Sequence, residues 1–217
     1  MEADLAGEKS GEKRETEKGE EMTEQPHEWY DQIFASTPHY AVHYTKSPYY
    51  GLWSAVADAM GPVESVLDLG CGTGQFACLL ADRGVKKYLG MDFSPVALDM
   101  ARAACPRDEF YFMIVNLCKG FAASLRWDCV VAIEVLEHVQ CDLEVIGSLR
   151  DGQKIIATVP TFPYESHVRH FTSAETVIER YESVLDNLVV RPVESNGLHF
   201  FLMEGRGRRD RGQRQGE

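Results

Sequence analysis

Long apolar runs are missing from this 217-residue sequence. No stretch reaches the roughly 18 consecutive apolar residues that a membrane-spanning helix needs. The first residues are acidic, whereas a secretory signal is basic and then apolar. We therefore expect a cytoplasmic protein with no membrane segment. With 44% hydrophobic residues, the chain is long enough for one well-packed domain and too short for two.

Paired cysteine motifs are missing too. Six cysteines, at positions 71, 78, 105, 118, 129 and 141, show no C-x-x-C spacing. Most of them lie within apolar runs, as reduced core thiols do. The sequence therefore predicts neither a structural zinc site nor a disulfide framework.

Basic charge is scarce and unevenly distributed. Residues 1–25 carry nine acids against four bases and almost no large apolar side chain, which predicts a disordered tail. Residues 205–217 carry five arginines against two acids and are predicted to form a second disordered tail. Without these tails, the net charge of −12 becomes −10 for residues 26–204. So acidic a domain suits a small or cationic partner better than a nucleic acid backbone.

Alternating apolar and helical segments predict a doubly wound α/β domain with a parallel sheet. The seven expected strands cover residues 64–69, 87–91, 109–115, 127–133, 153–159, 187–193 and 198–204. The expected helices cover residues 73–83, 94–104, 138–149 and 173–186, after short aromatic-rich helices within 27–60. Asn196-Gly197 is a hairpin signal, so the last strand should lie antiparallel in a mostly parallel sheet.

A glycine-rich segment, D-L-G-C-G-T-G, follows the first expected strand and covers residues 68–74. Three glycines at alternate positions let the backbone turn tightly and approach a ligand without a Cβ in the way. Asp92 ends the second strand 18 residues after Gly74, where its carboxylate can accept hydrogen bonds from both hydroxyls of a ribose. Together these features predict an adenosine site.

A third motif, E-V-L-E-H-V at residues 134–139, follows the fourth expected strand. With these three motifs in this order, residues 27–204 resemble the class I S-adenosylmethionine-dependent methyltransferases. Dinucleotide dehydrogenases differ, because they space their glycines as G-x-G-x-x-G. The resemblance implies a Rossmann-like domain, S-adenosyl-L-methionine as the cofactor, and methyltransferase activity.

The resemblance also implies the cofactor contacts. Asp68 would orient the methionyl amino end, Asp92 would bind the ribose, and Glu134 would flank the sulfonium. Phe93 would lie along the adenine, and Asn116 would accept a hydrogen bond from its N6, where the family often has aspartate. The expected set is Asp68, Gly70, Cys71, Gly72, Gly74, Gln75, Asp92, Phe93, Ser94, Asn116, Leu117 and Glu134. A purely structural role stays open for Asp68 at its strand end and for Asn116 in a turn.

Methyl transfer displaces the methyl group directly, so the protein mainly aligns the acceptor and excludes water. An oxygen or protonated-nitrogen acceptor also needs a base near neutral pKa. The candidate catalytic residues are His138, Glu137 and His167, with His170 as a further base. The Tyr- and Trp-rich block at residues 27–60 resembles the family's helical lid, which covers cofactor and acceptor.

Two interpretations of the 134–138 segment stay open. The spacing is expected to place Glu134, Glu137 and His138 at the start of one helix. With His167 or His170 they resemble the metal ligands of ubiquinone-pathway and small-RNA 2′-O-methyltransferases. Metal-free relatives share the segment, however, so we predict metal-independent transfer with no metal ligands. The dipole at the helix N-terminus would then stabilise the carboxylate of Glu137. His138 would accept a proton or would only pack in the first turn of the helix.

The predicted function is methyl transfer to an oxygen or nitrogen of a small molecule or glycan. Nucleic acid is disfavoured by the charge of −10 and, for base amino groups, by the absence of N-P-P-Y or D-P-P-Y after the fourth strand. A metal-assisted O-methyltransferase and an inactive methyltransferase-like binding subunit are the alternatives. The sequence predicts no particular acceptor and no oligomeric state.

Overall fold

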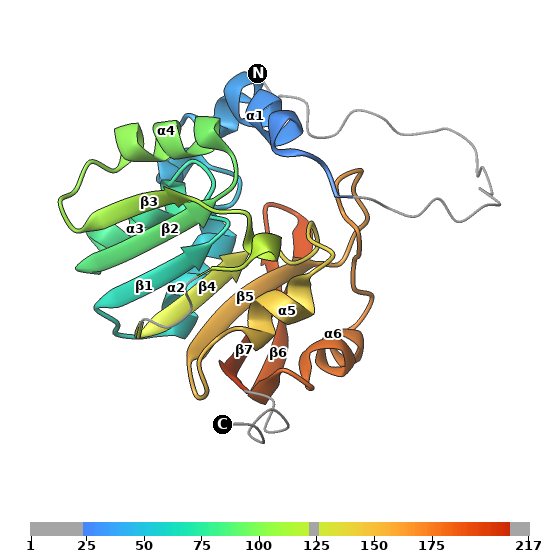
Figure 1. Cartoon of the computed structure of the whole chain (residues 1–217). Coiled ribbons are helices and arrows are strands. Elements are labelled where there is room, and N and C mark those ends of the chain that lie inside the picture. Colours follow the sequence, from blue (N-terminus) through green and yellow to red (C-terminus); the bar gives the residue numbers. More distant parts are fainter. Residues whose placement is uncertain (1–23, 122–125, 209–217) are drawn as a thin grey trace, which may run out of the picture.

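The computed structural model describes residues 24–121 and 126–208, which form a seven-stranded sheet with helices on both faces (Figure 1). The strands are β1 (Ser65–Leu69), β2 (Lys87–Asp92), β3 (Phe110–Ile114), β4 (Cys129–Ile133), β5 (Lys154–Pro160), β6 (Leu185–Ser195) and β7 (Leu198–Gly207). The α-helices are α1 (His27–Ser36), α2 (Tyr50–Met60), α3 (Gln75–Asp82), α4 (Pro95–Ala104), α5 (Asp142–Gly147) and α6 (Ala174–Tyr181). Three 3-10 helices are η1 (Pro38–Tyr40), η2 (Tyr44–Lys46) and η3 (Leu117–Lys119).

The strand order is β3-β2-β1-β4-β5-β7-β6. The first five strands pair in parallel, and β7 lies antiparallel between β5 and β6. Asn196 and Gly197 join the last two strands with φ angles of 51° and 75°, as a tight hairpin requires. The predicted doubly wound sheet with an antiparallel last strand is therefore confirmed.

Alternation along the strands builds a core on each face of the sheet. Val66 of β1 packs into a cluster with Leu80 of α3 and Leu98 of α4. Its neighbour Leu67 packs on the opposite face with Ile146 of α5. Within residues 24–121 and 126–208, none of the helices has the length and hydropathy to cross a bilayer.

Two helices are shorter than predicted. The helix expected over residues 138–149 covers only Asp142–Gly147, because the segment before it forms turns. Glu137 and His138 thus lie in a turn, and their predicted place at a helix start is wrong. The helix expected to reach residue 186 ends at Tyr181, and β6 begins at Leu185.

The C-terminal boundary also differs. Strand β7 continues to Gly207, whose amide donates to the carbonyl of Gln153 at 2.9 Å. Residues 205–207 therefore belong to the sheet, although the sequence predicted them as part of a tail. The rest of the two predicted tails, at 1–23 and 209–217, lies outside the described residues.

One cysteine pair corrects the prediction of reduced thiols. Cys118 of η3 and Cys141, directly before α5, form a disulfide with a Cα separation of 5.6 Å. The sequence concealed this pair because its partners are 23 residues apart and meet only through packing of η3 against α5. The free cysteines are Cys71, Cys78, Cys105 and Cys129.

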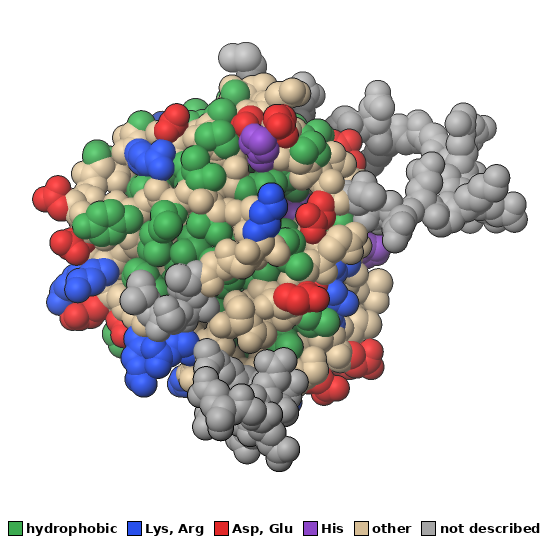
Figure 2. All heavy atoms as spheres, in the orientation of Figure 1, with side chains coloured by type: hydrophobic (Ala, Val, Ile, Leu, Met, Phe, Trp, Pro, Cys, Tyr) green, Lys and Arg blue, Asp and Glu red, His purple; other side chains and the backbone are tan. Residues whose placement is uncertain are grey.

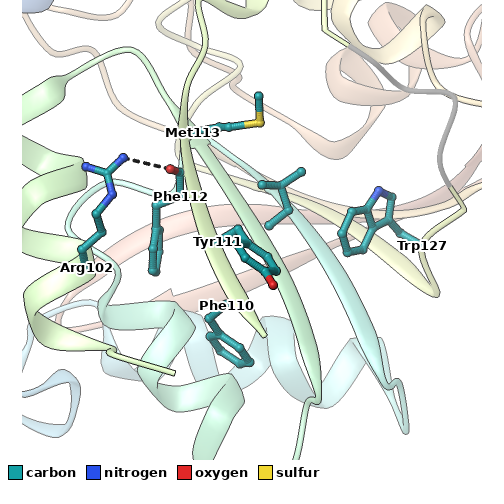
Figure 3. Close-up of a pocket in the computed structure, with 7 residues that line it drawn as sticks. Arg102, Phe110, Tyr111, Phe112, Met113 and Trp127 are labelled. Carbon is teal, nitrogen blue, oxygen red and sulfur yellow. Dashed lines mark hydrogen bonds between the residues drawn. The ribbon is translucent and has the colours of Figure 1, made fainter. Parts of the chain in front are cut away.

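The edge strand β3 is poorly covered on the face that carries α5. Among the described residues, the β3–β4 connection contains only η3, and hydrophobic side chains gather at the surface over β2 and β3 (Figure 2). A groove of about 660 Å³ there is lined by Leu89, Arg102, Phe110, Tyr111, Phe112, Met113 and Trp127 (Figure 3). Arg102 donates to the main-chain oxygen of Phe112 at 2.9 Å. This groove is formed by residues outside the predicted site.

Candidate functional site

The glycine loop between β1 and α3 can be built only from glycine at two positions. Gly70 and Gly74 both have a φ of 76°, in the left-handed region. A Cβ at Gly70 would lie 2.3 Å from Cγ2 of Val135, and one at Gly74 would lie 2.8 Å from Cα of Ala101. Both the backbone conformation and the space therefore exclude side chains at these positions.

The third glycine leaves room for a ligand. A Cβ at Gly72 would come no closer than 3.9 Å to any neighbour, the nearest being the ring of Phe34 in α1. The amide of Gly72 donates to Oδ2 of Asp92 at 2.9 Å, and the amide of Ser94 donates to Oδ1 at 2.9 Å. The loop after β1 is thus tied to the carboxylate that ends β2, as the predicted adenosine site requires.

Burial raises the pKa of Asp92, while the bonds from Ser94 and Gly72 oppose this shift. A carboxylate has about four acceptor positions, so the two amides leave acceptor capacity for further donors such as sugar hydroxyls. Asp92 can therefore hold the loop and still bind a ligand.

Asp68 lies in β1 with 2% of its surface exposed. The hydroxyl of Tyr88 donates to its Oδ2 at 2.5 Å. Burial raises the pKa of Asp68 to about 7, and the bond from Tyr88 acts in the opposite direction. Near neutral pH this carboxyl is thus poised between its two forms, and a nearby ligand cation would favour the ionised one.

On the predicted adenine side, Asn116 is exposed and caps η3, because its Oδ1 accepts from the amide of Cys118 at 3.0 Å. This is the turn role that the sequence left open, and the same oxygen retains a second acceptor position. Leu117 is half-buried beside it. Phe93 packs edge-on against Tyr30 of α1, with ring centroids 5.2 Å apart.

Three other residues of the predicted cofactor set support the loop or the lid. Gln75 donates through Nε2 to the carbonyls of His39 and Val42, at 3.0 and 2.7 Å, and so ties α3 to the segment before α2. Cys71 is buried under the loop. Ser94 donates to Asp31 of α1 at 2.5 Å and also caps α4.

The N-terminal helices lie over this loop. Figure 1 shows α1 beside α4 at one end of the sheet. Tyr30 of α1 lies between Phe93 and His138, with ring centroids 5.2 and 5.8 Å away. Burial raises the pKa of the Tyr30 hydroxyl, which keeps it neutral. The helices thus connect the glycine loop to the 134–138 segment, in the position predicted for a lid.

Glu134 follows β4 in a strained conformation. Its φ is 55°, in the left-handed region that costs an L-residue about 1–2 kcal/mol. Its amide donates to Oγ1 of Thr158 at 3.1 Å, and that hydroxyl donates to Oε1 of Glu134 at 2.8 Å. Burial raises the pKa of Glu134 to about 8. A half-buried acidic residue whose backbone is held in this conformation is typical of a functional site.

The predicted catalytic residues Glu137, His138 and His167 form one cluster. Their potential metal-ligating atoms lie within 4.8 Å of one another. Glu137 is fully buried, and neither carboxylate oxygen has a hydrogen-bond partner among the described residues. Nε2 of His138 lies 3.6 Å from Oε1 of Glu137. His170, the further candidate base, is exposed and does not belong to this cluster.

A main-chain carbonyl orients each of the two imidazoles. Nδ1 of His138 lies 2.9 Å from the carbonyl of Ser166, and Nδ1 of His167 lies 3.1 Å from the carbonyl of Phe162. A carbonyl only accepts, so each Nδ1 carries the proton and each Nε2 keeps its lone pair. Burial lowers the pKa of His138 to about 4 and also lowers that of His167. Both rings are therefore neutral near pH 7.

Burial raises the pKa of Glu137 well above its usual range. An isolated buried carboxyl without hydrogen bonds costs stability. Two imidazole lone pairs beside a carboxyl of this kind form a donor set that suits either a proton or a divalent cation. The residues thus fit a metal ion as well as a general base.

Arg169 holds the turn that carries Glu137 and His138. Its guanidinium donates to the carbonyls of Leu136 and Val139, and lies 3.3 Å from Asp142. Asp142 is fully buried and also pairs with Arg180 through two bonds of 2.6 Å. Arg169 therefore positions the turn that carries Glu137 and His138. Only the three-dimensional structure reveals this role, because no local sequence motif indicates these partners.

Known methyltransferases are similar in sequence to parts of this chain. Residues 67–151 match the family described as "Methyltransferase domain". A ribosomal protein L11 methyltransferase of Burkholderia orbicola is 34% identical over 71 residues, which are 26% of this chain and 24% of that protein. A tRNA U34 carboxymethyltransferase of Shewanella halifaxensis is 28% identical over 109 residues, 48% of this chain and 33% of that protein. The matches span a third or less of these relatives.

Solved structures share the fold over most of the chain. The N-methyltransferase NodS of Bradyrhizobium japonicum, in complex with S-adenosyl-L-homocysteine, has a TM-score of 0.57 at 19% identity and covers 81% of this chain and 90% of its own. The magnesium protoporphyrin IX methyltransferase of Synechocystis, with the same compound bound, has a TM-score of 0.59 at 17% identity, with coverage of 84% and 100%. At such identities the likeness establishes the fold.

Proposed function

We propose that this chain binds S-adenosyl-L-methionine and transfers the methyl group to an oxygen or nitrogen of a small acceptor, because residues 67–151 match a methyltransferase domain family and solved methyltransferases share its fold. The observation that carries the proposal is the bond between Gly72 and Asp92. It places an open glycine loop against a buried strand-end carboxylate, and that pair suits an adenosine.

The described residues fit the cofactor along its length. Asp92 has acceptor positions for the ribose hydroxyls, and Asp68 can pair with the ammonium of the methionyl end. The cofactor supplies an electrophilic methyl group on a sulfonium. Phe34 and Tyr30 of α1 cover the loop and exclude water from that methyl.

His138 and His167 are the candidate bases. Both rings are neutral near pH 7 and present Nε2 as an acceptor, so each can accept a hydrogen bond from an acceptor hydroxyl or ammonium. A pKa of about 4 makes His138 a weak base, so it mainly orients the acceptor, and His167 is the candidate for the proton. Tyr30 packs against His138, which brings this ring close to the cofactor side of the lid. The interpretation as an inactive binding subunit fits less well, because a binding subunit needs no oriented base.

A small acceptor is favoured over a macromolecule by charge and burial. Residues 26–204 carry a net charge of −10, which opposes binding to a nucleic acid backbone. The bases are largely buried under α1 and the 162–167 segment, where a compact acceptor fits. The curated relatives act on a tRNA and a ribosomal protein by name, so macromolecular acceptors belong in the test as competitors.

A second candidate is metal-assisted O-methylation. It is favoured by Glu137, whose two carboxylate oxygens have no hydrogen-bond partner among the described residues and which clusters with His138 and His167 within 4.8 Å. These residues would hold a divalent cation such as Mg²⁺ or Mn²⁺, and the cation would lower the pKa of an acceptor hydroxyl. The sequence instead predicted metal-independent transfer, so the two candidates make opposite predictions.

The test has two stages. Calorimetry should detect binding of S-adenosyl-L-homocysteine and no binding of NAD; the reverse result would refute the proposed cofactor. Turnover is then measured with methyl-labelled cofactor on metabolite, tRNA and ribosomal protein fractions. Exhaustive EDTA treatment, with Mg²⁺ or Mn²⁺ restored afterwards, decides between the candidates. Loss and recovery of activity would support the metal, and unchanged activity would support the histidines alone.

A further inference from the structure

The disulfide between Cys118 and Cys141 lies at the rim of the proposed cofactor site. Cys118 is exposed on η3 and follows Asn116 by two residues. Cys141 is half-buried and ends the turn that carries Glu137 and His138. The bond therefore joins the segment on the predicted adenine side to the segment that carries the predicted base.

Among the described residues, Leu117 packs η3 against the core, and the hydrogen bonds of the segment are local. Within it, the Oδ1 of Asn116 accepts from the amide of Cys118 at 3.0 Å. Gly120, which ends it, has a φ of 89° and nothing within 4 Å of a Cβ position. The opposite segment is better held, because Arg169 binds the carbonyls of Leu136 and Val139. The disulfide thus adds a covalent tie between a segment held by local hydrogen bonds and core packing and the segment held by Arg169.

The N-terminal end of the described chain meets the same place. The carboxylate of Glu24 accepts from the amide of Gln140 and lies 3.7 Å from Sγ of Cys118. Glu24 leads within a few residues into α1, whose Tyr30 packs on Phe93 and His138. Lid, adenine side and base segment therefore converge at the disulfide.

We propose that Cys118–Cys141 is a redox modification site, opened by a dithiol reductant, and that opening it weakens cofactor binding. This inference rests on the proposed function. A thiolate of the reductant attacks Sγ of exposed Cys118, which forms a mixed disulfide and releases Cys141 as a thiolate that takes up a proton. The second thiol of the reductant then releases Cys118. Overall, two electrons and two protons pass to the protein, and the reductant becomes a disulfide.

The physical reason is confinement of η3. With the bond closed, Asn116 and Leu117 stay near the adenine side before any ligand arrives. With the bond open, the segment samples more positions, and binding must order it again. The apparent affinity for S-adenosyl-L-homocysteine is the affinity of the ordered state multiplied by the fraction of molecules in which the segment is ordered. It therefore falls when that fraction falls.

Thiol counting comes first. The full chain, purified without reductant and denatured, is alkylated and analysed by mass spectrometry. We expect four alkylated cysteines, namely Cys71, Cys78, Cys105 and Cys129, and six after reduction. Peptide mapping should place the bond between residues 118 and 141. Six alkylated cysteines before reduction would overturn the proposal.

Binding is measured next, by titration with S-adenosyl-L-homocysteine before and after dithiothreitol treatment. We expect reduction to weaken affinity at least about fivefold, the lower end of common coupling between sites. Cys118→Ser and Cys141→Ser should each bind as weakly as the reduced protein and ignore dithiothreitol. Cys78→Ser, a free cysteine elsewhere in the fold, should keep the wild-type response.

Hydrogen exchange distinguishes a failure of the redox proposal from a failure of the proposed function. Reduction should speed exchange of the amides at residues 116–119. Unchanged affinity and unchanged exchange on reduction would overturn the redox coupling, whether or not the variants fold. If neither redox form binds S-adenosyl-L-homocysteine, the proposed function fails, and so does control of cofactor binding; faster exchange would then show only that the bond orders η3.

Discussion

The carboxylate of Asp92 accepts a hydrogen bond from the backbone amide of Gly72, 20 residues earlier in the chain, at 2.9 Å. It also accepts from the amide of Ser94. One buried side chain therefore fixes the end of β2, the start of α4 and the middle of the glycine loop. The glycine loop therefore has its conformation before a ligand binds to Asp92.

Asp92→Ala should weaken binding of S-adenosyl-L-homocysteine by about 1–3 kcal/mol, the scale of hydrogen bonds to a charged group. Stability should fall as well, because the amides of Gly72 and Ser94 lose their acceptor. Calorimetry and thermal unfolding measure the two effects. A variant that melts early but binds normally would show that Asp92 serves the fold alone.

Affinity for S-adenosyl-L-homocysteine should depend on pH through Asp68. Its pKa is about 7 in the free protein, and only the ionised form attracts the ligand ammonium. Below pH 7 the carboxyl is protonated, so affinity should fall by up to about tenfold per pH unit. Titrations between pH 6 and 8.5 test this.

Two variants calibrate that profile. Asp68→Asn should give weak binding without the pH dependence. Tyr88→Phe removes a hydrogen bond that favours the ionised carboxyl, so the pKa of Asp68 should rise and the profile should move to higher pH. A flat profile in the wild-type protein would exclude Asp68 as the partner of the ammonium.

Glu134→Gly and Glu134→Ala separate strain from function. Both remove the carboxyl and its bond with Thr158, but only glycine adopts a φ of 55° at no cost. The glycine variant should therefore be the more stable, by about 1 kcal/mol in the free energy of unfolding. Both should lose turnover equally. Equal stability of the two would show that the backbone relaxes at this position.

Glu137→Gln should stabilise the protein and reduce its activity. The native carboxyl is buried, has no hydrogen-bond partner within residues 24–121 and 126–208, and has a raised pKa, so above pH 5 it ionises more readily in the unfolded chain. Glutamine removes that penalty, and the gain in stability should be larger at pH 8 than at pH 5. Turnover should fall at least about tenfold, as expected where a site trades stability for function.

Chemical denaturation at both pH values tests the stability part, and exposed Glu28→Gln serves as the control. If the variant is less stable than the wild type at pH 8, Glu137 has a stabilising partner that the geometry does not include. Calorimetry with Mn²⁺ on the same variants adds the metal: binding to the wild type and none to Glu137→Gln would favour the second candidate.

Local motifs predicted most of the fold and the conformation of the glycine loop. The glycines at 70, 72 and 74 lie within one loop, and Asn196-Gly197 forms the hairpin between β6 and β7. In each case the partners lie within a few residues, so the sequence alone carries the signal. Asp92 was found in the same way, from its place at a strand end.

The rest of the site depends on contacts between distant segments. A helix was predicted from residue 138, but Arg169 binds the carbonyls of Leu136 and Val139, and residues 138–141 precede the helix, which begins at Asp142. The Cys118–Cys141 bond likewise depends on packing between η3 and α5. Such contacts have no local pattern, and tertiary structure overrides periodicity where they occur.

The bond from Arg102 to the main-chain oxygen of Phe112 has a consequence for how copies of the protein behave at high concentration. Strand β3 is the rim of the sheet and exposes Tyr111 and Met113, and a rim with apolar side chains is a template for fibrous cross-β assembly. An added strand would need the Phe112 oxygen as an acceptor. Since a charged side chain already occupies that oxygen, the sheet ends in a blocked ladder position, which opposes polymerisation through this edge.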